Sequence, residues 1–287
     1  MVFWRTFGNA VHAVSGEVDR LGFPAEDPYY IPDFYLKEGN FVILRTCMGI
    51  GDWGIISAMP RKLKQKYPNS KIYIPNKDLL SNLFGHLHGN WSSWDNPFEV
   101  SDIIFRNNPY VDDYIDYFSE EVFNDHYRIY TENYNEPLLK QMLRFWQFEE
   151  EEMVDINPEL YWSDEEKSLG DAIIREHTVD NNFITILISN RYTEEEIPKI
   201  QSKLNSLNEH NLPAYYWLSN PNIELKFKRA LDLRHIDIRI QLYIKSKAKF
   251  NIGNQSGVND TISPYAPTYT IPRGELGSNF LHSQIYF

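Results

Sequence analysis

The chain has 287 residues, of which 42% are hydrophobic and 24% are charged, and this composition fits one large globular domain or two smaller ones. The net charge of −12 argues against a nucleic-acid binder, which needs a basic surface to displace counterions from phosphates. The single cysteine, Cys47, excludes an internal disulfide and a cysteine-based zinc cluster.

Hydropathy along the chain indicates the expected cellular compartment. No apolar run approaches the roughly 18 uninterrupted residues of a membrane span. Residues 1–14 contain no continuous apolar segment of the kind that a secretory signal needs. We therefore expect a cytoplasmic protein, with peripheral contact to the inner membrane still open.

The first half of the chain predicts a βαβ unit that follows an N-terminal extension over 1–38. A β-rich apolar run predicts a strand at 40–45, and a glycine-rich turn follows at 46–54. Apolar residues at spacings of three and four predict a helix over 55–67, and 71–75 predicts the next strand. Such units build parallel sheets.

The pattern is less regular beyond this unit. Short strands are predicted at 101–105 and 114–117, and an amphipathic helix at 137–148. The acidic run at 149–152 is typical of a solvated face or a linker. The domain boundary is expected near residue 155.

The second half alternates between helices and strands. It opens with a helix predicted over 163–177, because Ser163-Asp164-Glu165-Glu166 has the capping-box pattern. Further strands are predicted at 182–188, 214–218 and 249–252, and further helices at 194–209, 223–230 and 240–246. The predicted fold class is α/β, with two Rossmann-like domains over 39–155 and 156–287.

Two small-residue turns are candidates for binding. In an open parallel sheet, ligands bind beyond the carboxyl ends of the strands, where glycine lets backbone N–H groups approach an anion. The first turn contains Thr46, Gly49, Gly51 and the carboxylate of Asp52. The second contains Gly253, Asn254, Gln255, Ser256 and Gly257. On the residues alone, a structural turn is the favoured interpretation of both, with Asp52 as a helix N-cap in the first.

The first turn meets neither common nucleotide motif. It lacks the third glycine of the dinucleotide fingerprint and the lysine of a P-loop. Arg191 follows the strand predicted at 182–188 and is either a phosphate clamp or an exposed loop arginine.

Several segments together resemble the ADP-heptose:lipopolysaccharide heptosyltransferase family, which is glycosyltransferase family nine. The similar segments are Gly49-Ile50-Gly51-Asp52, Met59-Pro60-Arg61-Lys62-Leu63, the runs 66–72, 108–116, 231–234 and 248–257, and finally Pro272 and Gly274. They span residues 40 to about 275 in the family's order and spacing.

The resemblance implies a GT-B fold, in which two Rossmann-like domains face each other across a cleft. It implies an N-terminal acceptor domain, a C-terminal domain that binds a nucleotide-sugar donor, and a glycan or glycolipid acceptor. It also implies an inverting transfer that needs no metal or other cofactor, with Asp52 as the general base. The residues that it assigns to the donor are Arg191, Lys199, Gly253, Asn254, Gln255, Ser256, Gly257 and Asp260.

Two positions depart from the family pattern. Gln255 stands where the family has an aspartate that holds the donor sugar, and Asp260 stands where it has a histidine. Two alternatives therefore stay open: a catalytically degenerate GT-B module that binds sugar nucleotides, and a glycosyltransferase acting on a modified nucleic-acid base. A Rossmann oxidoreductase is disfavoured by the missing third glycine.

Overall fold

The protein is described from a computed structural model, which covers residues 40–43, 49–78, 99–115, 137, 139–140, 143, 148–178, 182–190, 192–207, 211–272 and 284–287. The chain divides into two compact units between Tyr161 and Trp162. No helix in these ranges has the length and hydropathy that a bilayer crossing requires. The extension predicted over 1–38 and most of the helix predicted at 137–148 lie outside the described residues.

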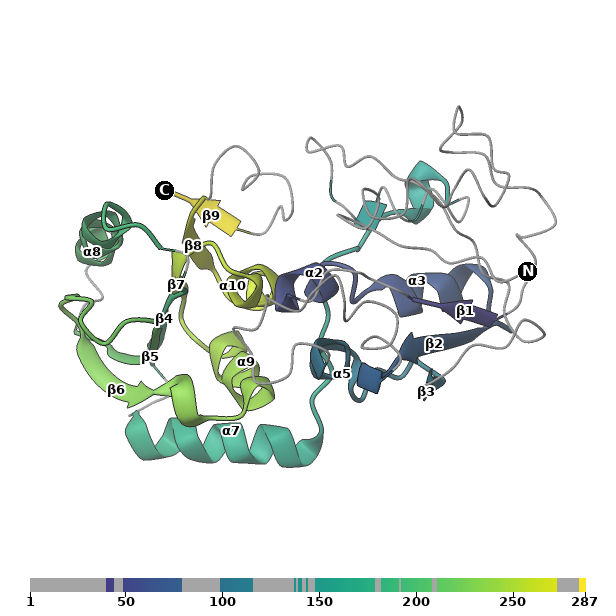
Figure 1. The fold of residues 1–287 in the computed structure, drawn as a ribbon, viewed down its shortest axis with the longest axis horizontal. Helices are drawn as coiled ribbons and strands as arrows, with labels where there is room; N and C mark the ends of the chain where they lie inside the picture. The colour runs from purple at the N-terminus through teal and green to yellow at the C-terminus, as the bar shows by residue number, and fades with distance from the viewer. Residues whose placement is uncertain are drawn as a thin grey trace. The chain divides into compact units, whose positions relative to one another are not determined.

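The C-terminal unit, residues 162–287, alternates helices with strands (Figure 1). Its helices are α7 (Asp164–His177), α8 (Glu196–Ser206), η4 (Leu233–His235), α9 (Ile238–Ser246) and α10 (Gly257–Ile262). Its strands are β4 (Ile184–Ile188), β5 (Pro213–Leu218), β6 (Lys228–Asp232), β7 (Asn251–Asn254), β8 (Thr268–Ile271) and β9 (Gln284–Tyr286).

These strands form one six-stranded sheet in the order β6-β5-β4-β7-β8-β9, and every neighbouring pair is parallel. The chain builds outward from β4 to β6, then crosses to the other side of β4 and builds from β7 to β9. This is the strand order of a doubly wound Rossmann sheet, and the order reverses between β4 and β7. The predicted α/β class with a parallel sheet is confirmed.

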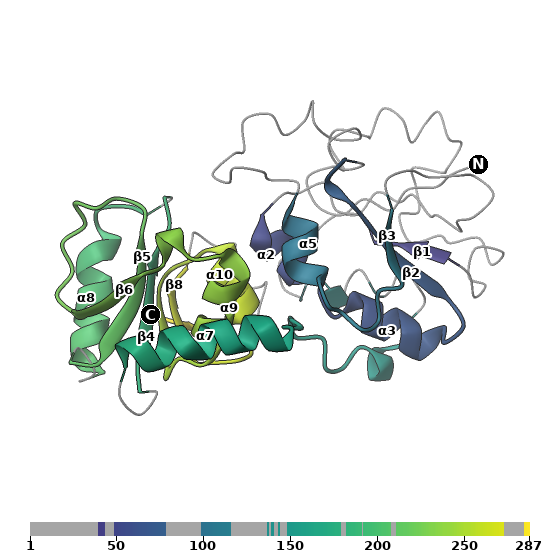
Figure 2. The same ribbon diagram turned by 90° about the horizontal axis from the view of Figure 1, so that it is seen from below.

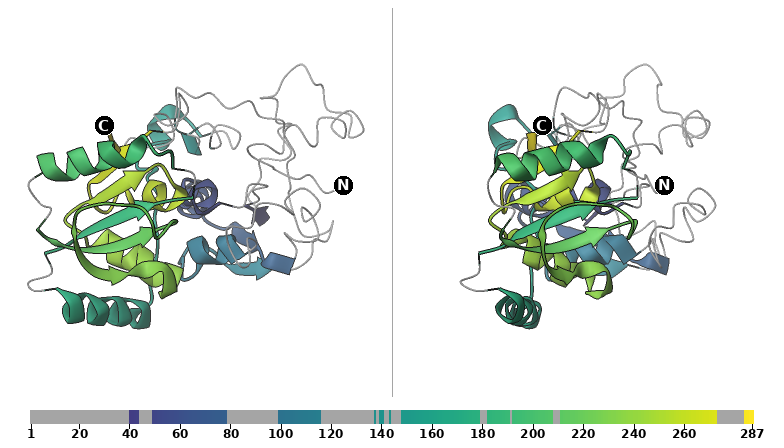
Figure 3. Two further views of the ribbon diagram at one scale, coloured as in Figure 1. Left: turned by 60° about the vertical axis from the view of Figure 1, so that its left-hand side comes forward. Right: turned by 90° about the vertical axis from the view of Figure 1, so that its left-hand side faces the viewer.

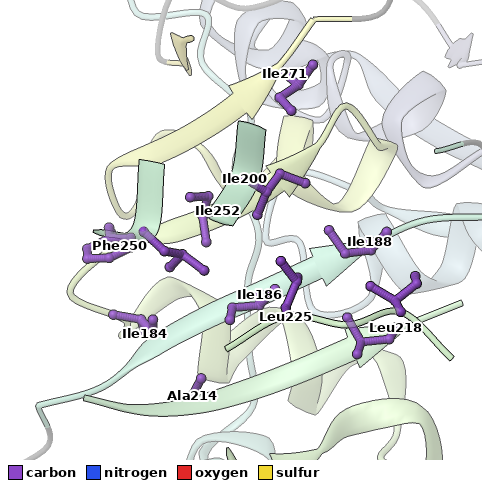
Figure 4. Packing of buried hydrophobic residues seen from close by; sticks show 12 residues of the cluster. Ile184, Ile186, Ile188, Ile200, Ala214, Leu218, Leu225, Phe250, Ile252 and Ile271 are labelled. Atoms are coloured by element: carbon purple, nitrogen blue, oxygen red, sulfur yellow. The ribbon is translucent and has the colours of Figure 1, made fainter. Parts of the chain in front are cut away.

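Helices cover both faces of this sheet, with α8 on one face and α7 and α9 on the other (Figures 2 and 3). Alternate residues of β4, Ile184, Ile186 and Ile188, pack in one cluster with Ile200 and Leu204 of α8 (Figure 4). The opposite face carries a second cluster, in which Phe183, directly before β4, and Tyr215 of β5 pack with Ile174, Ile240 and Ile244. Burial of each such side chain contributes about 1.5–3 kcal/mol.

The N-terminal unit contains a parallel three-stranded sheet in the order β1-β2-β3. Its described elements are β1 (Asn40–Val42), α2 (Ile50–Gly54), α3 (Met59–Lys66), β2 (Lys71–Pro75), α5 (Val100–Phe105), β3 (Asp113–Ile115) and η3 (Glu150–Glu152). The buried Trp53 of α2 packs edge to face on Phe105 of α5, with ring centroids 6.0 Å apart.

The end of this unit folds back onto α3. Arg61 Nε donates to Glu159 Oε2 at 2.8 Å, and Lys66 Nζ donates to Glu152 Oε2 at 2.6 Å. The backbone N–H of Glu159 donates to Ser57 Oγ at 2.7 Å. The hydrogen bond from Lys66 lowers the pKa of Glu152. Glu152 of the acidic run is therefore paired with Lys66 of α3. The sequence pattern predicts only a solvated face or a linker for this run.

The helix predicted over 223–230 is wrong. Residues up to Phe227 are irregular, and β6 follows as an edge strand beside β5. Ile223 and Leu225 are buried, whereas Glu224 and Lys226 between them are exposed. This alternation has the period of two that extended chain shows, although the apolar spacing of four from Ile223 to Phe227 also fits a helix.

The strand predicted at 101–105 is also wrong, because these residues form α5. Ile103, Ile104 and Phe105 are consecutive buried residues. A short continuous apolar run has no periodicity that separates a strand from a buried helix.

Of the helix predicted over 55–67, only residues 59–66 are helical and form α3, whereas residues 55–58 form a turn. A further helix, α2, occupies residues 50–54, within the glycine-rich turn predicted at 46–54. Pro60 lies in the first turn of α3. Its ring nitrogen cannot donate a hydrogen bond, so proline is tolerated at the start of a helix and breaks its interior. The helix predicted from residue 55 therefore begins at Met59.

Candidate functional site

The carboxyl edge of the C-terminal sheet is lined with small polar residues. Ser189 directly follows β4, Ser219 follows β5, and Gln255 follows β7. Within the described part of the chain, the buried hydroxyl of Ser219 has no hydrogen-bond partner. In doubly wound sheets, ligands bind at this edge where the strand order reverses, which here lies between β4 and β7.

The Asn254 side chain forms hydrogen bonds from the end of β7 to the residue that follows β4. Its Oδ1 accepts a hydrogen bond from the backbone N–H of Ser189 at 2.8 Å, and its Nδ2 donates to Ser189 Oγ at 2.9 Å. The residue is 3% exposed. Both ends of the amide are therefore committed to Ser189, and Asn254 reaches the edge as the last residue of β7 rather than within a turn.

Gly253 also belongs to β7, which corrects the turn predicted from residue 253 onward. A Cβ at this position would lie 1.9 Å from the backbone oxygen of Leu187 and 3.2 Å from Asn259 Nδ2. The missing side chain thus lets β7 approach β4 and leaves room for the amide of Asn259.

The true turn is the pair Gln255 and Ser256. The N–H of Gln255 donates to the backbone oxygen of Ile271 at 3.1 Å, which extends the pairing of β7 with β8. Ser256 is the N-cap of α10 and accepts a hydrogen bond from Asn259 N at 3.3 Å. Gln255, Ser256 and Gly257 are each partly exposed, so a ligand at this edge can reach them.

Asp260 lies in the first turn of α10 and is partly exposed. Its N–H donates to the backbone oxygen of Ser256 at 2.9 Å. Burial of the Tyr286 phenol, with the nearby charge of Asp260 as a second cause, raises the pKa of Tyr286 to about 12. Asp260 therefore adds a negative charge beside the amide of Gln255 and the hydroxyl of Ser256.

The structure places only one of the two cations that the resemblance assigns to the diphosphate. Arg191 lies outside the described residues. Lys199 is exposed on α8, next to Ile200, which is in the core.

The first turn of the N-terminal unit is described around Asp52, whereas Thr46 and Cys47 lie outside the described residues. Asp52 is the third residue of α2, and the N-cap is Gly49. Asp52 Oδ2 accepts a hydrogen bond from Gly49 N at 3.0 Å, and a Cβ on Gly49 would lie 2.6 Å from the same oxygen. Gly49 thus gives the carboxylate room to fold back, while the partly exposed Gly51 accepts the N–H of Ile55 at 3.0 Å.

Sequence reasoning missed Ser189, Ser219 and Asn259 as parts of this edge. Ser189 and Ser219 each directly follow a predicted strand, and that position is the signal by which they could have been found. Asn259 is fully buried, and its role depends on a contact with Asn254 that no local pattern predicts.

The chemistry available at the edge is hydrogen bonding by hydroxyls, amides and backbone N–H groups. Such groups match the hydroxyls of a sugar and the oxygens of a phosphate. Among the described residues, no group of three or more His, Cys, Asp or Glu side chains could hold a metal ion.

No family model matches the sequence, and no curated protein matches it. Solved structures do match the fold. A family 9 glycosyl transferase from Veillonella parvula DSM 2008 has a TM-score of 0.59 at 10% identity, covering 91% of this chain and 88% of that one. The E. coli ADP-heptose LPS heptosyltransferase II has a TM-score of 0.51 at 10% identity, covering 87% of this chain and 90% of that one. The chain therefore shares the fold of these two glycosyltransferases, as the resemblance in the motifs predicted.

Proposed function

We propose that the protein is a glycosyltransferase that moves a sugar, heptose or a related one, from a nucleotide donor to a hydroxyl of a glycan or glycolipid. The N-terminal unit supplies the acceptor domain and the C-terminal unit the donor domain, in the GT-B manner. The reaction inverts the anomeric centre and needs no metal.

One observation carries the proposal: the reversal of strand order between β4 and β7 coincides with the polar edge of Ser189, Gln255 and Ser256. That edge is where doubly wound sheets bind nucleotides. Both structural neighbours quoted above are glycosyltransferases, and the name of one specifies ADP-heptose. The hydroxyl and amide groups of the edge form hydrogen bonds with the sugar of the nucleotide donor. Arg191 or Lys199 neutralises the diphosphate.

In the proposed reaction, the acceptor hydroxyl attacks the anomeric carbon while the Asp52 carboxylate takes its proton. The bond between the anomeric carbon and the diphosphate oxygen breaks, and the nucleoside diphosphate leaves with both electrons of that bond. A positioned base makes the hydroxyl a competent nucleophile. Cations and backbone N–H groups stabilise the charge that develops on the leaving group.

The test is a thermal-shift and calorimetric screen with ADP-heptose, ADP-glucose, GDP-mannose and UDP-glucose, each beside its nucleoside diphosphate alone. A ligand at 100 times its Kd stabilises the folded state by about 2.7 kcal/mol. We expect one sugar nucleotide to raise the Tm, whereas a protein that binds none of them contradicts the proposal.

A pair of variants locates the sugar. Gln255→Ala should raise the Kd for the sugar nucleotide at least fivefold and leave the Kd for the nucleoside diphosphate nearly unchanged. Gln201→Ala is the matched control, since the Gln201 amide donates to the backbone oxygen of Lys226 and not to the edge. Equal effects of the two variants would mean that Gln255 does not contact the sugar.

A further inference from the structure

The side chain of Asn254 is one link in a chain of hydrogen bonds that starts on α10. Asn259 Nδ2 donates to the backbone oxygen of Asn254 at 3.1 Å, and the Asn254 amide in turn holds Ser189 by two bonds. Both asparagines are buried, Asn259 at 0% and Asn254 at 3% exposure. This chain joins α10 to the ends of β7 and β4.

The position of this chain is specific. The backbone pairing of β4 with β7 ends at Leu187 and Gly253, and the Asn254 amide bridges the same two strands just beyond that point. Ser189 has a second contact, because the N–H of Tyr192 donates to the Ser189 backbone oxygen at 3.2 Å. Ser189 is thus held from two sides, by Asn254 and by Tyr192, and the Asn254 amide helps to set where the segment after β4 begins.

The oxygen and the nitrogen of the Asn254 amide both form hydrogen bonds with Ser189. Its position in the motif therefore does not make Asn254 a direct contact of the donor. We infer that Asn254 and Asn259 are positioning residues, which set the spacing between Ser189 and the Gln255–Gly257 segment and thereby the affinity for the donor. This inference rests on the proposed function.

The test compares two asparagines of the same strand. Asn251 is also fully buried in β7, and it too bonds side chains of both neighbouring strands, because it accepts from Thr185 Oγ1 at 2.5 Å and donates to Thr268 Oγ1 at 3.3 Å. It lies at the start of β7, away from the carboxyl edge. Asn251→Ala therefore removes a buried amide of the same kind without touching Ser189.

The Kd is measured for the sugar nucleotide of the panel above that stabilises the wild-type protein most, at a temperature where every variant is folded. We expect Asn254→Ala and Asn259→Ala each to raise this Kd at least tenfold. The double variant should add little, since both residues act through one chain. Asn251→Ala should lower the Tm and leave the Kd within threefold of wild type.

An unchanged Kd in Asn254→Ala, or an equal rise in Asn251→Ala, overturns the inference while the proposed function stands. If the wild-type protein binds no sugar nucleotide, the proposed function fails and the inference fails with it.

Discussion

Gly253 of β7 lies so close to Leu187 of β4 that a Cβ would come within 1.9 Å of the Leu187 backbone oxygen. The two residues are register partners in the parallel ladder. Glycine at this position is therefore a condition for β4 and β7 to pair next to the candidate site, whatever ligand the edge binds.

Gly253→Ala should destabilise the protein by about 3 kcal/mol or more, because the added methyl meets backbone that cannot move without breaking the ladder. Gly170→Ala is the comparison, since its Cβ would lie 2.3 Å from a ring carbon of Tyr243. The clash at Gly170 is with a side chain and not with backbone, and alanine gains up to about 1 kcal/mol over glycine within a helix, so the loss should be smaller. Urea unfolding of both variants checks the difference; equal losses would contradict the account of Gly253.

The buried guanidinium of Arg239 should contribute far more to the free energy of unfolding than an exposed guanidinium does. Arg239 is 1% exposed and bonds Glu166 through Nε and Nη2, the latter at 3.0 Å. Arg239→Ala leaves that carboxylate without its cation and should cost about 3–5 kcal/mol. Arg234→Ala, which breaks the exposed pair with Asp232, should cost less than about 1 kcal/mol. Chemical denaturation measures the free energy of unfolding of both variants. Comparable losses would contradict the claim that burial makes the Arg239 pair the stronger of the two.

Lys245 predicts a pH dependence of stability. It is fully buried, its Nζ donates to Thr185 Oγ1 at 3.0 Å, and burial lowers its pKa from 10.5 to about 7. Between these two pH values the unfolded chain binds more protons than the folded one, so this lysine makes stability rise with pH. Its cost is fully present below about pH 7 and fades as the pH approaches 10.5.

Lys245→Met should therefore stabilise the protein near pH 7, by an amount on the order of 1–4 kcal/mol. The advantage of the variant over wild type should shrink as the pH rises from about 7 toward 10.5. Urea unfolding of both proteins across this range is the measurement. An advantage that stays constant, or a variant less stable than wild type at pH 7, would contradict the account.

The parts of the fold that follow from neighbouring residues could be predicted from the sequence. Ser163 and Glu166 cap α7 as the pattern indicates, since Glu166 N donates to Ser163 Oγ at 3.1 Å and Ser163 N donates to Glu166 Oε2 at 2.7 Å. The strand β4 could be predicted equally well, because its residues form a short apolar run of β-branched and aliphatic side chains.

The parts that depend on distant partners could not be predicted. The strand β6 forms because β5 offers it an edge, while the local apolar spacing favoured a helix. The link from Asn254 to Ser189 joins residues 65 positions apart, so the motif located the edge and left the role of the amide open. Asp52 was found by its turn, but the sequence suggested it as the N-cap, whereas the N-cap is Gly49 and Asp52 is the third residue of α2.

The assignment of Asp52 as the base can be tested without disturbing the start of α2. In Asp52→Asn, the amide oxygen can still accept the N–H of Gly49 that the carboxylate now accepts at 3.0 Å. The variant should therefore fold and bind the donor like wild type. Asp102→Asn is the matched control, because Asp102 lies in the first turn of α5 in the same unit.

The most direct measurement is transfer of labelled sugar from the stabilising sugar nucleotide to glycan and glycolipid acceptors, with donor affinity measured on the same preparations. We predict turnover by the wild-type protein and by Asp102→Asn. For Asp52→Asn we predict a loss of at least about 100-fold in turnover, with the donor Kd within threefold of wild type, as removal of a general base requires. Transfer by Asp52→Asn at the wild-type rate would contradict the account.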